Sequence, residues 1–179
     1  MNLEDIRVFR ILLEDGRTIN IEVYPEVAPK TVENFIKLVD SNYYEGVVFH
    51  RVIDKFMIQT GGYYIDGNVL CEKESNETIV GEFASNGFEN NIKHKLGVVS
   101  MARTNDPNSA SGQFFICSAS CPWLDGNYAA FAKVIDDESI RTVLDISHVQ
   151  TTNIGGGFTD FPVEPITIKS IMRAIKVEL

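Results

Sequence analysis

A charged side chain within an apolar run is the first feature of the sequence that could do chemistry. Arg51 stands in the strand-like segment 49–53. Its guanidinium is charged at every working pH and offers five N–H donors in one plane. Such a group can stabilise an atom that gains electron density during a reaction. An arginine on the solvent face of a strand would look the same, so this segment alone leaves both interpretations open.

Two later segments hold further candidates for a binding site. Residues 111–117 place Gln113 before two phenylalanines, of which Phe114 is expected in the core. Residues 123–131 hold the only tryptophan of the chain beside turn residues, where full burial is less expected. Each of these segments alone is weak evidence for a site.

Several common kinds of catalytic site have no signature in this sequence. It contains no P-loop, no Gly-x-Gly-x-x-Gly phosphate motif, no Gly-x-Ser-x-Gly elbow and no His-Glu-x-x-His zinc motif. The cysteines and histidines are scattered, so neither a zinc site nor a disulfide framework is expected. A Cys/His nucleophilic pair stays open, although nothing in the sequence marks one. These residues are Cys71, Cys117, Cys121, His50, His94 and His148.

The overall charge restricts the partners of the protein. A formal net charge of -9 argues against broad binding to nucleic acid or to anionic membranes, because positive charge must meet phosphate there. Lys93-His94-Lys95 is the only short basic cluster, and we interpret it as a solvated turn. No window approaches about 18 consecutive apolar residues. The first residues have neither a basic start nor an apolar signal core, so we expect a cytoplasmic protein.

The first forty residues have the clearest local pattern. Two apolar runs, 6–13 and 18–24, flank Asp15-Gly16, and the second run alternates with the period of a half-buried strand. Asp-Gly between such runs predicts a hairpin. A helix is expected from Pro29, because the missing N–H of proline would be unpaired at the first helical position anyway. Its apolar stripe consists of Val32, Phe35, Ile36 and Val39.

The rest of the chain predicts one more helix and several short strands. The helix is expected over residues 136–148, where three acidic residues suit the positive end of its dipole. This mixture indicates a closed antiparallel barrel with helices at its ends. Such a small barrel is filled by its own side chains, so the site should lie on the outer wall or in loops. The expected strands are residues 47–53, 97–102, 114–118, 129–135 and 165–177.

Residues 63–96 are the least regular part of the sequence. They are polar, contain several glycines and have little periodicity. Long loops of this kind in compact domains are often functional. A plain surface excursion fits the pattern equally well.

Together, the segments described above resemble the cyclophilin family. The matching pieces are Phe-His-Arg-Val-Ile, Phe-Met-Ile-Gln, Ser-Met-Ala, Gln-Phe-Phe-Ile and Trp-Leu-Asp-Gly, in the family's order and at compatible spacings. The resemblance also covers Ala-Pro-Lys-Thr-Val-Glu-Asn-Phe near residue 30 and Val-Glu-Pro-Ile-Thr-Ile near the end. It therefore spans nearly the whole chain. Residues 81–87 and 100–104 look like the bacterial branch of the family.

This resemblance implies both a fold and an activity. The expected fold is mainly β, a closed eight-stranded antiparallel β-barrel capped by two α-helices, in a single domain over residues 1–179. The expected activity is peptidyl-prolyl cis-trans isomerisation, which assists protein folding by accelerating rotation about Xaa-Pro bonds. No bond is made or broken, so neither a cofactor nor a metal is expected. The implied partners are proline-containing peptides and unfolded or folding proteins, and the implied inhibitor is cyclosporin A.

The resemblance also implies the residues of the site by position. Arg51 matches the family's catalytic arginine, and Phe56 and Gln59 are expected to act with it. Trp123 matches the tryptophan at the groove edge that is linked to cyclosporin binding. Phe56 also belongs to the apolar pocket for the proline ring, whose other members are Met57, Phe115 and Leu124. The full set of expected substrate-binding residues is His50, Met57, Ala102, Arg103, Thr104, Gln113, Phe115, Trp123, Leu124 and Tyr128.

Three positions depart from the family pattern. Thr60 stands where the family usually has glycine beside the glutamine, and Tyr128 stands where many members have histidine at the pocket rim. Arg103 replaces the asparagine of many eukaryotic members. We expect Arg103 to change peptide preference more than chemistry, because the contact at this position resembles one made by the backbone. Tyr128 is bulkier than histidine and could crowd a peptide or cyclosporin.

Two other functions remain open from the sequence. A non-catalytic proline-peptide binding module or a holding chaperone could use the same fold. An unrelated small β-barrel enzyme, such as a cysteine-dependent hydrolase, is the second alternative. Binding of a proline peptide without faster isomerisation would favour the binding module. Full activity after thiol alkylation would count against the cysteine-dependent hydrolase.

Overall fold

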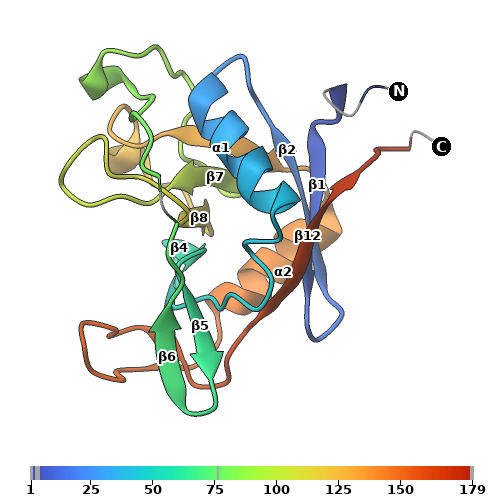
Figure 1. The fold of residues 1–179 in the computed structure, drawn as a ribbon, viewed down its shortest axis with the longest axis vertical. Coiled ribbons are helices and arrows are strands. Elements are labelled where there is room, and N and C mark those ends of the chain that lie inside the picture. The colour runs from blue at the N-terminus through green and yellow to red at the C-terminus, as the bar shows by residue number, and fades with distance from the viewer. Residues whose placement is uncertain (1, 3–4, 76, 178–179) are drawn as a thin grey trace.

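A curved antiparallel sheet of eight strands organises the fold, and two helices pack against it (Figure 1). The structure is a computed structural model that describes residue 2, residues 5–75 and residues 77–177. The sheet has eight strands in the order β12-β1-β2-β9-β7-β8-β4-β3. Their bounds are β1 Val8–Leu13, β2 Thr18–Val23, β3 Arg51–Ile53, β4 Met57–Thr60, β7 Val98–Met101, β8 Phe114–Cys117, β9 Ala130–Val134 and β12 Ile168–Ala174.

The N-terminal hairpin confirms the prediction made from its alternating pattern. Strands β1 and β2 pair antiparallel around the Asp15-Gly16 turn. The Asp15 carboxylate accepts a hydrogen bond from the backbone N–H of Arg17 at 2.9 Å, which fixes this turn. Every second residue of each strand faces the core, as the period of a strand requires. The buried residues are Phe9, Ile11, Leu13, Ile19, Ile21 and Val23.

Both predicted helices form, and each has its N-terminus satisfied in a different way. Helix α1 spans Pro29–Asp40 and helix α2 spans Asp137–Ser147. In α2, the side chain of Asp136 caps the helix by accepting from the N–H of Ser139 at 2.8 Å. Helix α1 has no such local cap, and the buried carboxylate of Glu82 accepts from the N–H of Thr31 at 2.6 Å instead. The loop that carries Glu82 is thereby tied to α1.

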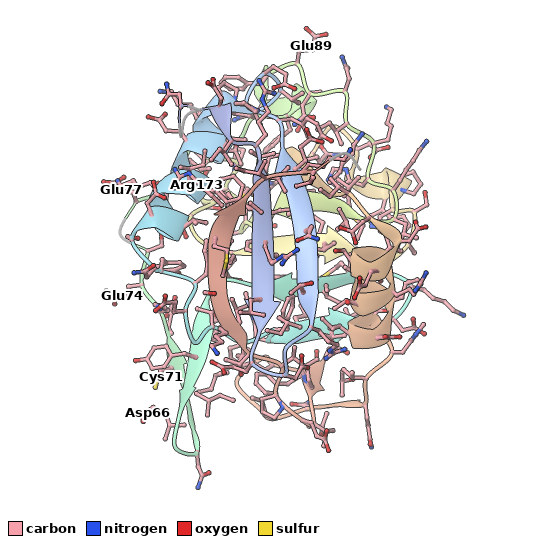
Figure 2. The ribbon with its side chains drawn as sticks, turned by 90° about the vertical axis from the view of Figure 1, so that its right-hand side faces the viewer. Asp66, Cys71, Glu74, Glu77, Glu89 and Arg173 are labelled. Atoms are coloured by element: carbon pink, nitrogen blue, oxygen red, sulfur yellow. The ribbon has the colours of Figure 1, made fainter. Side chains whose placement is uncertain are left out.

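The main core lies between the curved sheet and the helices. Phe35 of α1 is at its centre and meets four other aromatic rings from the sheet and from the loop after the helix. Residues Val143 and Ile146 of α2 join the same core. Arg173 of β12 also pairs with Asp40 at the end of α1, and Figure 2 shows Arg173 beside that helix.

The closed barrel expected from the sequence is not confirmed. Strands β3 and β12 stand at the two ends of the sheet and do not pair along their length in the described part of the chain. The segments leading into them do meet, because the N–H of Phe49 donates to the carbonyl of Ile166 at 3.0 Å. The two ends of the sheet do not join into a closed barrel, because the residues just before β3 form only isolated bridges and not a strand. The sheet is therefore an open half-barrel.

The irregular stretch 63–96 contains a hairpin that the sequence did not reveal. Strands β5 Tyr63–Asp66 and β6 Val69–Glu72 pair with each other and project from the main body (Figure 1). Figure 2 shows Asp66 and Cys71 on this projection, away from the main sheet. Farther along this stretch lies a short turn of helix, η2 Ala84–Asn86. A small sheet elsewhere in the chain pairs β10 Thr151–Thr152 with β11 Phe161–Pro162. No helix in the described ranges is long and apolar enough to cross a membrane.

Candidate active site

Adjacent strands of the sheet place Arg51 and Gln59 side by side. Arg51 of β3 is directly opposite Gln59 of β4, and Gln59 is in turn opposite Phe115 of β8. Alternation along β3 buries Val52 and leaves Arg51 exposed on the outer wall. Arg51 Nη1 donates to Gln59 Oε1 at 3.3 Å, and its guanidinium lies 5.8 Å from the centre of the Phe56 ring. The arginine is therefore positioned from two sides.

A second amide continues this line of hydrogen bonds. Gln59 Nε2 donates to Gln113 Oε1 at 3.0 Å. Gln113 immediately precedes β8, so the line runs across three neighbouring strands of the outer wall. Because the amide nitrogen of Gln59 is engaged by Gln113, its oxygen is left facing Arg51 as an acceptor. The two glutamines thus orient the guanidinium.

A small cavity of about 120 Å³ lies against this arginine. Met57, Phe115 and Leu124 form its buried apolar part and belong to a second hydrophobic cluster, separate from the main core. The cavity combines a permanently charged donor with an apolar floor, which is the composition of many small-molecule sites. Its lining residues are Arg51, Phe56, Met57, Gln59, Ala102, Arg103, Phe115, Leu124 and Tyr128.

Two further cavities adjoin the small cavity, because each shares part of its lining with it. One, of about 290 Å³, brings Thr104 and Gln113 together with Gln59 and with three residues that the sequence did not single out, Glu72, Ser109 and Ser111. The other, of about 260 Å³, contains His50 and Arg51. It is completed by residues that sequence reasoning also missed, namely Tyr63, Gly156, Gly157, Phe158, Thr159 and Asp160.

A wider cavity of about 730 Å³ lies elsewhere and contains none of the predicted site residues. Its walls include Ile92, Leu96 and three lysines, Lys93, Lys95 and Lys133. No line of oriented side-chain hydrogen bonds comparable to Arg51-Gln59-Gln113 faces it among the described residues. We therefore assign the candidate site to the smaller cavity, on chemistry rather than on size.

His50 is placed behind the arginine rather than in the apolar cavity. Its side chain is only 5% exposed and meets the Tyr63 ring edge-on at 4.7 Å. Burial, followed by the charge of Arg51, lowers the pKa of His50 to about 4. The imidazole is neutral at pH 7, and its Nδ1 has no hydrogen-bond partner in the described part of the chain.

This buried imidazole makes folding stability depend on pH. In an unfolded chain the pKa of histidine is 6.5, so between about pH 6.5 and 4 the unfolded state binds more protons than the folded state. The free energy of unfolding should therefore fall by about 3 kcal/mol as the pH drops through this window, because a tenfold change in an equilibrium is worth about 1.4 kcal/mol. Urea unfolding from pH 7.5 to pH 4.5 measures it.

The variant His50→Gln isolates this contribution. It keeps a polar side chain of similar size but cannot be protonated, so its stability should decline less over the same pH range. His94 and the carboxylates stay present in both proteins and cancel in the comparison. An identical pH dependence in the two proteins would show that His50 is not the group responsible.

Trp123 and Tyr128 stand at the rim of the small cavity. Trp123, on the short helical turn η3 Pro122–Leu124, is 60% exposed, and its ring centre lies 5.7 Å from that of Phe56. It does not line the cavity itself. Tyr128 does line it, and its ring meets that of Phe115 edge-on with 6.0 Å between the ring centres.

The structure brings the predicted site residues together. Of the thirteen, nine line the small cavity. The others adjoin it: His50, Thr104, Gln113 and Trp123.

A buried polar cluster supports the cavity from behind. The Lys93-His94-Lys95 segment was predicted to be a solvated turn, and for His94 this is wrong, because its side chain is 1% exposed. His94 Nδ1 and Nε2 lie 2.9 Å from Asp125 Oδ1 and from Ser100 Oγ, and the ring stacks near Phe115 at 6.1 Å. Burial lowers the pKa of His94, although Asp125 opposes the shift. Ser100 is fully buried, so the cluster is structural rather than nucleophilic.

Comparison with known proteins identifies relatives along nearly the whole chain. The family described as cyclophilin type peptidyl-prolyl cis-trans isomerase/CLD matches residues 8–173. Peptidyl-prolyl cis-trans isomerase A of Dickeya dadantii is 35% identical over 165 residues, covering 89% of this chain and 81% of that protein. Peptidyl-prolyl cis-trans isomerase cyp18 of Streptomyces antibioticus is 39% identical over 163 residues, covering 87% and 91%.

The fold agrees with these relatives. A crystal structure of a cyclophilin type peptidyl-prolyl cis-trans isomerase from Cryptosporidium parvum, determined in the presence of the dipeptide Ala-Pro, superimposes with a TM-score of 0.74. The two sequences are 28% identical, and the match covers 94% of this chain and 99% of the other. The arginine, the paired glutamines and the apolar cavity on the outer wall of a two-helix β fold thus occur in a chain that belongs to the cyclophilin-type peptidyl-prolyl cis-trans isomerase family.

Proposed function

We propose that this protein catalyses the cis-trans isomerisation of Xaa-Pro peptide bonds, with Arg51 as the central catalytic residue. The observation that carries the proposal is the placement of the Arg51 guanidinium, oriented by Gln59, at the edge of a small apolar cavity. Rotation about an amide is slow because resonance must be broken, at a barrier of roughly 18–20 kcal/mol. A catalyst for this step must stabilise the twisted amide more than the planar one.

Arg51 can provide that difference. In the twisted state the proline nitrogen regains a lone pair, and an N–H donor directed at it stabilises only this state. Arginine cannot lose its charge at working pH, and its planar fork can serve the nitrogen and Gln59 at once. A charge-assisted hydrogen bond contributes about 1.5–3 kcal/mol, which is only part of the acceleration such an enzyme needs.

The apolar cavity supplies the remainder in this proposal. Phe56, Met57, Phe115 and Leu124 hold the proline ring while the other side of the bond rotates. They also exclude water, which would weaken the hydrogen bonds of Arg51. The backbone near Ala102 and the neighbouring cavity that contains Thr104 and Gln113 are suited to bind the peptide chain beside the proline.

Other features of the chain support a proposal for its domain organisation and its location in the cell. We propose that residues 1–179 act as one domain on proline-containing segments of unfolded or folding proteins. The single main core and the continuous family match over residues 8–173 support one domain. Three cysteines without disulfide partners suit a reducing compartment, and on this basis we propose the cytoplasm.

Two experiments separate this proposal from its alternatives. A protease-coupled assay on a short Xaa-Pro peptide distinguishes turnover from mere binding: binding seen by Trp123 fluorescence without acceleration would favour a binding module. A cysteine-dependent hydrolase fits poorly, because burial raises the pKa of both the Cys117 and Cys121 thiols and disfavours the reactive thiolate. Loss of all activity on thiol alkylation would nevertheless revive that alternative.

Cyclosporin A is expected to bind beside Trp123 and inhibit the enzyme. An exposed indole offers a large apolar face and one N–H donor to a cyclic apolar peptide. Trp123→Ala should raise the inhibition constant about tenfold or more, whereas kcat/KM should change much less because Trp123 does not line the small cavity. Inhibitor titration of the enzymatic rate measures both quantities, and in the unmutated protein emission from the single tryptophan is an independent signal of binding. Saturating cyclosporin that alters neither emission nor rate would contradict this placement.

A further inference from the structure

Two of the positions that depart from the family pattern touch each other beside the proline cavity. The Arg103 guanidinium lies 4.6 Å from the centre of the Tyr128 ring and 4.9 Å from the centre of the Phe83 ring. Both distances are within the roughly 6 Å at which an arginine is attracted to a ring face. Arg103 therefore joins three segments: the residues after β7, the segment before η2 and the turn before β9.

Hydrogen bonds to backbone carbonyls hold the guanidinium of Arg103 in place. Its Nε and Nη2 both donate to the carbonyl of Asn127, at 3.2 and 2.6 Å, and its Nη1 donates to the carbonyl of Thr104 at 2.8 Å. The planar fork is thus used along two edges. A guanidinium held in this way has little freedom to move.

The Phe83 end of this contact is a rigid anchor. Phe83 is 1% exposed, and a Cβ at Gly81 would come within 2.3 Å of its ring, so the ring is packed closely on that side. The neighbouring Glu82 is fixed to the N-terminus of α1 through Thr31. Asn90 adds a hydrogen bond to the carbonyl of Glu82 at 3.0 Å. A shift of Phe83 would disturb several buried contacts at once.

The Tyr128 end of the contact forms part of the cavity wall. Tyr128 meets Phe115 edge-on, with an interplanar angle of 80°, and both rings line the cavity together with Arg103. At about 120 Å³ this cavity is the smallest of the three adjoining cavities. The position of Tyr128 therefore limits the width of the space that a ring can occupy.

We propose that Arg103 is a positioning residue that pins Tyr128 against Phe115 and restricts the cavity to a five-membered imino-acid ring. This inference rests on the proposed isomerase function and adds the substrate class that the cavity accepts. If Tyr128 is held in place, it cannot move aside for a larger ring. One extra methylene in a fixed apolar pocket changes kcat/KM by roughly 10- to 200-fold. A six-membered ring, as in pipecolic acid, is therefore disfavoured by this factor while Arg103 holds Tyr128 in place.

The test uses two peptides that differ only in the ring, one with proline and one with pipecolic acid. The ratio of their kcat/KM values is measured for the full chain and for Arg103→Met, Tyr128→Ala and the double variant. We expect each single variant to lower the preference for proline about tenfold, mainly through a lower KM for the pipecolic-acid peptide. The double variant should show no further change, because both single variants release the same wall.

Matched variants separate this role from a general effect on charge or folding. Lys95→Met removes a positive charge that lines a different cavity and should leave the ratio unchanged. Arg103→Lys keeps the charge and the stem but loses the planar fork, so it should behave like Arg103→Met even if the latter folds poorly.

Three results would overturn the proposal. Equal losses for both peptides in the Arg103 variants would indicate a structural or backbone-binding role, and multiplicative effects in the double variant would show that Arg103 and Tyr128 act independently. An unchanged ratio in Arg103→Lys would show that the fork is not needed. Failure of the wild-type protein to turn over the proline peptide would instead refute the isomerase function, and the ring preference would then be measured by Trp123 emission as binding.

Discussion

Replacing Arg51 with alanine is expected to lower kcat/KM at least about 100-fold, equivalent to about 2.7 kcal/mol of transition-state stabilisation. Arg51 is exposed on the outer wall and its side chain bonds only to Gln59 among the described residues, so the fold should survive its removal. The loss should appear mainly in kcat, because the lone pair that Arg51 contacts exists only in the twisted state. Steady-state kinetics on a proline peptide and circular dichroism measure the two effects.

Two control variants sharpen this experiment. Arg51→Lys keeps the charge as a point but loses the planar fork, so it should also fail substantially. Arg10→Ala removes another exposed arginine, which lies on β1 and donates to Asn20 of β2. Because Arg10 does not line the small cavity, this variant should keep near-normal turnover. Near-normal turnover in a folded Arg51→Ala protein would end the mechanism proposed for this site.

Replacing Phe35 with alanine should produce the largest loss of stability, about 3–5 kcal/mol. Phe35 is 1% exposed and packs against four aromatic rings. The distance between ring centres is 5.4 Å to Phe9 and to Phe131, 5.8 Å to Tyr44 and 6.0 Å to Phe114. Its removal leaves a cavity that four rigid rings cannot readily fill. Because domains of this size are stable by only about 5–15 kcal/mol, chemical denaturation should show a large shift of the midpoint.

A phenylalanine outside the core provides the comparison. Phe88 is 39% exposed, so Phe88→Ala should change the free energy of unfolding by less than about 1 kcal/mol. Equal losses for the two variants would mean that α1 is not held by its aromatic contact with the sheet. The packing of Phe35 against both β1 and β8 would then have to be reconsidered.

The elements with strong local patterns could be predicted from the sequence. The Asp15-Gly16 hairpin and the helix that begins at Pro29 are fixed by alternation, turn chemistry and the geometry of proline. The 63–66 and 69–72 hairpin was missed because its residues are partly exposed on both faces, so no alternation marks it. Closure of the barrel was overestimated because pairing between distant segments depends on tertiary contacts rather than on any local signal.

The candidate site was predicted as a set of residues but not as a set of contacts. Motif order and spacing singled out Arg51, Gln59 and Gln113, and the structure connects them through hydrogen bonds. No local pattern could show that Arg103 contacts Tyr128, because the pairing of β7 with β9 brings the two residues together. Each departure was therefore interpreted separately, whereas their physical effect depends on the pair.

The burial of His94 illustrates the same difficulty. A histidine between two lysines has the composition of a solvated turn, and both lysines are indeed exposed. The imidazole is buried because Asp125 and Ser100, distant in sequence, offer partners to its two nitrogens. A buried polar group is stable where such partners exist, and only the fold reveals them.

Exchange spectroscopy on an Xaa-Pro peptide tests the central claim most directly, since it detects rotation about the bond without a coupled enzyme. Uncatalysed exchange takes tens to hundreds of seconds, so a peptide alone shows no exchange peaks at mixing times below about one second. With catalytic amounts of the wild-type protein we expect peaks that connect the cis and trans signals, and with Arg51→Ala we expect these peaks to vanish. At excess peptide, binding to the variant should persist as a change in Trp123 emission. A change in Trp123 emission on peptide binding, without exchange peaks for the wild-type protein, would contradict the account and leave a binding module in its place.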